Sequence, residues 1–92
     1  MEFAWDARKA RSNLAKHGIT FDEAQSVFLD DNARLIGDPD HSDDEDRFVL
    51  LGYSKLARCL IVCHCYRKAE SSIRLISARR ATSLKRRAIG VK

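Results

Sequence analysis

The chain has 92 residues, of which 45% are hydrophobic and 33% are charged, with four glycines and one proline. This length fits a single domain over residues 1–92 and excludes a second folded unit, and the apolar content excludes an intrinsically disordered chain. The net charge is +4, no apolar stretch approaches the roughly 18 residues that cross a bilayer, and the first residues lack the pattern of a secretory signal, so we expect a cytoplasmic protein without membrane contact.

Two short helices are predicted near the N-terminus. Asp6 is a suitable N-cap and Gly18 a suitable C-cap for a helix over residues 7–17, whose apolar positions recur at helical spacing. A Thr-Phe-Asp-Glu capping box at residues 20–23 opens a second helix over residues 21–28. Such short helices do not persist alone in water, so their apolar sides must pack on a larger element.

That larger element is predicted to be a sheet. Four apolar or alternating runs, separated by short polar links, have the length and composition of strands: residues 33–37, 48–53, 58–66 and 72–77. The links 54–57 and 67–71 are short enough for hairpins, which favours an antiparallel meander. Thr82 caps a last helix over residues 83–90. The expected fold is therefore α+β, in the order ααββββα, with a four-stranded and mainly antiparallel sheet.

Alternation along the predicted strands assigns their side chains to faces. In the third strand, one face carries Leu60, Val62, His64 and Tyr66, and the other carries Cys59, Ile61, Cys63 and Cys65. Both faces are largely apolar, so this strand is expected at the centre of the sheet, covered on both sides. In the fourth strand, the same alternation separates Arg74 and Ile76 from Ile73, Leu75 and Ser77.

The three cysteines lie close together in the third predicted strand, at positions 59, 63 and 65. Their spacing differs from the C-x2-C pair of zinc sites, and His64 is expected to point away from both neighbouring cysteines. We therefore predict buried free thiols that pack as small hydrophobic groups, with no metal and no cofactor.

Charge is divided unevenly along the chain. Residues 1–46 hold five basic and twelve acidic residues, and residues 47–92 hold twelve basic residues and one acidic residue. Six of the acidic residues cluster in residues 38–46, which we expect to form a mobile loop. A basic half of this kind is typical of a protein that binds a polyanion, although a solvated surface gives the same pattern.

The basic half contains the residue types that metal-independent cleavage of RNA requires. A base must take the proton of the 2′-hydroxyl group, and cations must face the charge that builds on phosphorus. His64 is a candidate base, and the candidate cations on the adjacent strand are Arg74, Arg79 and Arg80. Pairing of the third and fourth strands is expected to bring His64 near Arg74. A buried His64 with a purely structural role is the alternative.

Further basic residues are candidates for contacts with the RNA backbone: Lys16, Lys85, Arg86 and Arg87. His17 precedes Gly18 at the predicted helix end, where a cation interacts favourably with the helix dipole. His41 lies among the acids of the predicted loop, where a solvated or partner-binding role is favoured.

Several segments together resemble the BrnT toxins. They are Phe3 to Asp6, Asn13 to Ala24, Asp40 with His41, Glu45 to Phe48, and Ile73 to Thr82. They span nearly the whole chain in the family's order, and N-L-x-K-H-G and I-R-x-I-S-A-R-x-A-T are the most specific. The matching polar positions are Lys16, His17, His41, Glu45, Arg47, His64, Arg74, Arg79 and Arg80.

The resemblance implies a RelE-like fold and a ribonuclease toxin that inhibits translation in a bacterial type II toxin–antitoxin system. It also implies a BrnA-type antitoxin that neutralises the toxin, binds DNA and represses the shared operon with the toxin as co-repressor. The chain would then contact DNA only through the antitoxin.

The C-terminal segment departs from the family pattern. These toxins commonly have Thr-x-x-Glu followed four residues later by Tyr, whereas this chain has Lys85 and Ile89 at those positions. If the glutamate only completes a capping box, its loss costs at most about 1 kcal/mol. If the missing groups act on RNA, the activity is weakened. A non-catalytic module that binds protein or nucleic acid is the competing hypothesis.

Overall fold

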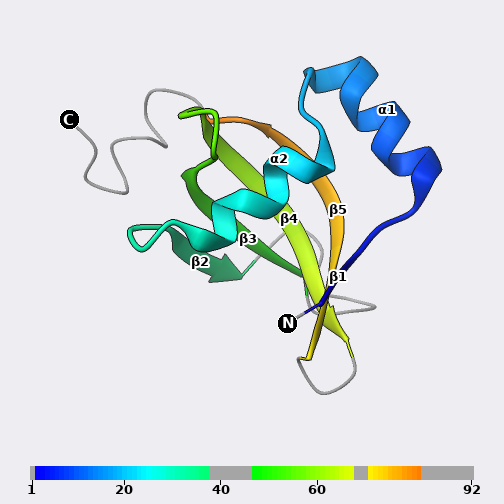
Figure 1. Cartoon of the computed structure of the whole chain (residues 1–92). Coiled ribbons are helices and arrows are strands. Elements are labelled where there is room, and N and C mark those ends of the chain that lie inside the picture. Colours follow the sequence, from blue (N-terminus) through cyan, green and yellow to red (C-terminus); the bar gives the residue numbers. More distant parts are fainter. Residues whose placement is uncertain (1, 38–46, 68–70, 82–92) are drawn as a thin grey trace.

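Five strands form one mixed sheet in the order β1-β5-β4-β3-β2 (Figure 1). The computed structural model describes residues 2–37, 47–67 and 71–81; the predicted loop 38–46 and the predicted helix 83–90 lie outside this part of the chain. The strands are β1 (Glu2–Ala4), β2 (Arg34–Gly37), β3 (Arg47–Tyr53), β4 (Cys59–Arg67) and β5 (Ser72–Arg80). The predicted meander is confirmed, because β2, β3, β4 and β5 pair antiparallel in succession.

The prediction of four strands is wrong because β1 was missed. This strand has three residues and pairs parallel with the first residues of β5, with Phe3 opposite Ile73. Three residues are too few for alternation to be recognised, and the partner strand lies far along the chain. The predicted strand 72–77 also continues to Arg80.

The predicted helix over residues 7–17 is confirmed as α1 (Ala7–His17). The Asp6 carboxylate accepts a hydrogen bond from the Arg8 N–H, and Gly18 ends the helix with a φ of 70°, in the left-handed region that favours glycine. The second helix is shorter than predicted: α2 (Phe21–Ser26) begins at the Thr20 cap and tightens into the 3-10 helix η1 (Val27–Leu29). Helices often end in such a turn.

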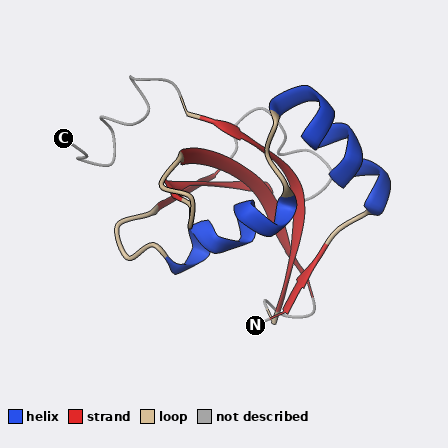
Figure 2. Cartoon of the chain, turned by 45° about the horizontal axis from the view of Figure 1, so that its top comes forward, coloured by secondary structure: helices blue, strands red, loops and turns tan. Residues whose placement is uncertain are grey.

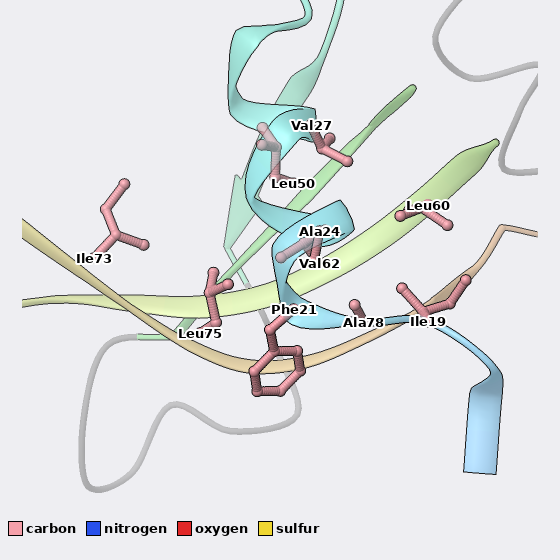
Figure 3. Close-up of a cluster of buried hydrophobic side chains, with 10 residues drawn as sticks. All are labelled: Ile19, Phe21, Ala24, Val27, Leu50, Leu60, Val62, Ile73, Leu75 and Ala78. Carbon is pink, nitrogen blue, oxygen red and sulfur yellow. The ribbon is translucent and has the colours of Figure 1, made fainter. Parts of the chain in front are cut away.

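Both helices lie on the same face of the sheet, α1 beside β5 and α2 across the central strands (Figure 2). Apolar side chains from α2, from its flanks and from the strands beneath form the main core (Figure 3): Ile19, Phe21, Ala24, Val27, Leu50, Leu60, Val62, Ile73, Leu75 and Ala78. A smaller cluster on the opposite face contains Leu51, Cys59 and Ile61. As predicted, β4 is therefore central and buried on both faces.

Two buried polar groups of the segment from Asn13 to Ala24 hold the fold together, and the first is Asn13. Its Nδ2 donates to the carbonyl oxygens of Ile19 and Ala78 at 2.9 and 2.8 Å, and its Oδ1 accepts from the Ala78 N–H at 3.0 Å. The amide thus pairs with Ala78 as a neighbouring strand would. This bond fixes α1 beside the second half of β5, beyond the end of β1.

The second buried polar group is Glu23, which is 2% exposed. Its carboxylate accepts hydrogen bonds from the Arg58 guanidinium and from the Ser54 hydroxyl. The Arg58 hydrogen bond is the largest influence and, although burial opposes it, holds the pKa of Glu23 below its ordinary value. The pair fastens α2 to the turn between β3 and β4.

Within the described ranges, no helix is long and apolar enough to cross a membrane.

Candidate functional site

A β-bulge in β5 determines which side chains share a face of the sheet. Cys63 of β4 lies opposite Ser77, but the next residue, His64, lies opposite Leu75, which leaves Ile76 without a partner. The alternation of β5 is reversed at this point. Ser77 therefore shares the face of Arg74, and the prediction that groups Ser77 with Leu75 is wrong.

The bulge places Arg74 and Arg79 on the same face, opposite the helices. Arg74 lies opposite Cys65, and Arg79 lies opposite Ile61. Residues directly opposite one another in an antiparallel pair project from the same face, and Ile61 belongs to the cluster on the side opposite α1 and α2. Arg79 is exposed and Arg74 is half-buried.

Arg47 adds a third guanidinium group to this face. It begins β3 and lies opposite Cys65, so that Arg47 and Arg74 flank Cys65 in one row across three strands. Because Cα atoms on neighbouring strands are about 5 Å apart, the Cα atoms of Arg47 and Arg74 are about 10 Å apart. Arg79 of β5 lies opposite Ile61, which is four residues from Cys65 on β4. Arg79 is therefore about 13 Å from this row along the strand direction. We call the face opposite α1 and α2, with Arg47, Arg74 and Arg79, the arginine face.

His64 lies on the other side of the sheet. Its imidazole is 0% exposed and is enclosed by aromatic rings, with centroids 4.9 Å from Phe28, 5.2 Å from Tyr66 and 6.3 Å from Phe48. Nδ1 donates to the Val62 carbonyl at 3.2 Å, so Nε2 of the neutral ring accepts from the Tyr66 hydroxyl at 3.3 Å. The prediction that His64 and Arg74 face one phosphate is wrong.

The environment of His64 favours its neutral form. Burial lowers the pKa of the imidazole, and the hydrogen bond to the Val62 carbonyl opposes this effect only in part. A neutral, fully enclosed ring does not reach a bound RNA strand. The alternative role considered for His64, a structural one, fits this geometry.

Arg80 is also separated from Arg74 and Arg79. It lies opposite Leu60, a residue of the helix-side core. The Arg58 hydrogen bond is the main cause of the lowered pKa of Glu23. The positive charge of Arg80 attracts the Glu23 carboxylate and lowers its pKa further. The prediction that Arg80 joins the other two arginines at one site is therefore wrong. Sequence alternation alone separates neighbours such as Arg79 and Arg80, but it does not reveal the bulge.

The remaining predicted RNA contacts fall in two regions. Lys16 is exposed on α1, which packs beside β5, whereas Lys85, Arg86 and Arg87 lie outside the described residues, as does His41. His17 is exposed in the last turn of α1, as predicted. The sequence marks Arg47 only as a position that matches the BrnT pattern, and its place at the start of a strand does not indicate its face.

All three cysteines are thiols, as predicted; Cys59 and Cys65 are buried as expected, whereas Cys63 is only half-buried. The cysteines share the face of Ile61 in the smaller cluster, whereas His64 shares the face of Val62 in the main core. The thiols and the imidazole therefore lie on opposite faces of the sheet. Among residues 2–37, 47–67 and 71–81, no three His, Cys, Asp or Glu side chains gather as metal ligands would. The chemistry available on the arginine face is the binding and stabilisation of anionic oxygen atoms by guanidinium groups.

Comparison with known proteins adds a family and a fold. Residues 5–84 match the family described as "Ribonuclease toxin, BrnT, of type II toxin-antitoxin system". Among solved structures, the chain is similar to the crystal structure of the Brucella abortus ribonuclease toxin BrnT, with a TM-score of 0.67 and 25% identity. That match covers 90% of this chain and 99% of the Brucella chain. No curated protein is significantly similar to it in sequence.

Proposed function

Because the chain belongs to the BrnT family of ribonuclease toxins of type II toxin–antitoxin systems, we propose that it cleaves RNA on the arginine face without a metal ion. The observation that carries this proposal is the bulge at Ile76, which gives Arg74 and Arg79 a common face. Bulges are frequent beside active sites, where they redirect side chains. The sheet with both helices on one face also supports the RelE-like fold that the resemblance implies.

The proposed reaction uses the RNA's own 2′-hydroxyl group as nucleophile. Its oxygen loses its proton to water and attacks the adjacent phosphorus. The bond to the 5′-oxygen breaks and that oxygen takes a proton from water, so the products carry a 2′,3′-cyclic phosphate and a 5′-hydroxyl group. Negative charge builds on the phosphoryl oxygens in the transition state. Preorganised cations that face this charge lower the barrier.

The three arginines have different parts in this proposal. Arg47 and Arg74 flank the scissile phosphate above Cys65, which their common row supports. Arg79 binds a neighbouring phosphate further along the strand and so positions the RNA. His64 takes no part in proton transfer, because its ring is enclosed in the core.

Incubating the purified protein with single-stranded RNA in excess chelator tests the proposal. We expect fragments with 2′,3′-cyclic phosphate ends, detected by end-group analysis, and we expect Arg74→Gln to reduce their formation. Intact RNA would contradict the proposed activity. Tight, salt-sensitive binding without cleavage would identify the chain as the non-catalytic module considered above.

The family also implies an antitoxin partner. We propose a BrnA-type antitoxin that covers the arginine face, neutralises the inhibition of translation in the cytoplasm, and represses the shared operon together with the toxin. Contact with DNA would then pass through the antitoxin alone. Growth arrest on expression of the toxin, relieved by co-expression of the adjacent gene, is the expected result; arrest that persists would contradict this pairing.

A further inference from the structure

Helix α1 carries a second concentration of positive charge, separate from the arginine face. Its eleven residues include no Asp or Glu, and its four Lys and Arg side chains are all exposed: Arg8, Lys9, Arg11 and Lys16. We call these residues the α1 basic surface. Only Asn13 of this helix is buried, so most of the helix surface faces solvent.

Helical spacing gathers these cations on one part of the helix. At 3.6 residues per turn, Arg8 and Arg11 lie one turn apart and Lys9 and Lys16 lie two turns apart, within an arc of about 160°. The arc contains only the small side chains of Ser12 and Ala15 between the cations. It lies away from the centre of the contact that Asn13 and Ala10 make with the rest of the fold.

The charge of this surface is not neutralised by the described carboxylates. Asp6 is used as the N-cap, where it accepts from the Arg8 N–H at 2.7 Å. Asp22 pairs with Lys55, and Glu23 pairs with Arg58. In the part of the chain that the structure describes, no ion pair involves Lys or Arg of α1. These cations therefore attract an external polyanion.

Helix α1 lies at the edge of the sheet, beside the half of β5 that carries Arg79. Asn13 binds the backbone of Ala78, and the next residue, Arg79, projects onto the arginine face. β1 pairs only with residues 72–74 of β5, and α1 lies beside the other half of that strand (Figure 1). An RNA strand that passes Arg79 and continues over this edge of the sheet would therefore meet α1.

We propose that the α1 basic surface binds the phosphate backbone of RNA beyond the scissile position, so that the preferred substrate is long enough to contact both surfaces. This proposal rests on the proposed function of the arginine face. Phosphate contacts require cations and little apolar area. Protein–protein interfaces, in contrast, are organised around apolar or aromatic residues, which the arc lacks.

Binding of 2′-O-methyl RNA tests the proposal independently of cleavage, because that RNA lacks the attacking hydroxyl group. The neutralised variant is R8Q/K9Q/R11Q/K16Q, and the matched control R8K/K9R/R11K/K16R keeps every charge. Gln, Lys and Arg have similar helix propensities, so both variants preserve α1. Circular dichroism and thermal unfolding verify this.

We expect wild type and the charge-preserving control to bind an RNA of about 20 nucleotides more tightly than a tetranucleotide. The neutralised variant loses most of that difference, and its slope of log affinity against log salt concentration falls by about 2, which corresponds to about three lost phosphate contacts at 0.7 each. An unchanged length dependence and salt slope in the neutralised variant would overturn the proposal.

Two further outcomes separate the proposals. If the neutralised variant loses binding but wild type cleaves no RNA, the α1 surface is supported and the proposed ribonuclease activity fails. If the neutralised variant binds RNA normally but no longer forms a complex with a co-expressed antitoxin, the surface recognises protein and the inference fails.

Discussion

Arg74 and Arg79 share a face of the sheet although they lie five positions apart along β5. In a regular strand an odd separation places side chains on opposite faces. The unpaired Ile76 supplies the extra residue that reverses the alternation. A single irregularity of the backbone therefore places Arg79, rather than its neighbour Arg80, on the face of Arg74.

The burial of His64 predicts a specific dependence of stability on pH. Its pKa is lowered in the folded state from an ordinary value of 6.5, so the unfolded chain binds the proton more readily. The buried neutral ring therefore contributes to the free energy of unfolding, and this contribution is complete above pH 6.5. It is lost as pH falls from 6.5 toward the lower folded pKa, at up to about 1.4 kcal/mol per pH unit. Urea unfolding at pH 7 and pH 5.5 measures this loss.

A His64→Phe variant keeps an aromatic ring in the same cluster and removes the titrating group. We expect its free energy of unfolding to change less between pH 7 and pH 5.5 than that of wild type. Ser12→Ala, at an exposed position without a titrating group, is the control and retains the wild-type slope. Equal slopes in wild type and His64→Phe would show that another group is responsible.

Asn13 is predicted to be essential for stability. Asn13→Ala removes the partner of the Ala78 N–H and of the carbonyl oxygens of Ala78 and Ile19. Buried groups left without a partner cost about 1–3 kcal/mol each, so we expect the free energy of unfolding to fall by about 3 kcal/mol. Ser12→Ala, at an exposed position on the same helix, is the control. A loss below about 1 kcal/mol would contradict the importance of these bonds.

Gly52 is predicted to be intolerant of any side chain. A Cβ atom there would lie 2.7 Å from the Ala33 Cβ and 2.9 Å from Asp30 Oδ2, an oxygen that accepts from the Tyr53 N–H. We expect Gly52→Ala to destabilise the fold by about 1–3 kcal/mol.

Adding Ala33→Gly to this variant removes the closest contact. We expect the double variant to lose less stability than the sum of the two single changes, as measured in a double-mutant cycle. Strict additivity would show that the two residues do not collide.

Local patterns predicted much of the fold. The caps at Asp6, Gly18 and Thr20 define the helix starts and the end of α1 because each satisfies backbone groups within a few residues. Alternation also predicted the two faces of β4. Pairing over long distances was not accessible, because β1 carries only three residues of pattern and its partner lies at the other end of the chain.

The candidate site was predicted less well for the same reason. Residue type correctly indicated that arginines are available for an anion, but the face of each one depends on register. The bulge at Ile76 has no sequence signature, so the sequence does not reveal which of Arg79 and Arg80 shares the face of Arg74. His64 was selected by its chemistry, whereas its burial depends on aromatic side chains from three separate elements.

The rate of RNA cleavage by three single variants tests the role of the arginine face most directly. Arg74→Gln, Arg79→Gln and Arg80→Gln remove the same charge from the same strand, but only the first two alter this face. We expect kcat/KM to fall by at least about 10-fold for Arg74→Gln and Arg79→Gln and by less than about 2-fold for Arg80→Gln. Equal losses in all three variants, or the largest loss in Arg80→Gln, would contradict the assignment of the site.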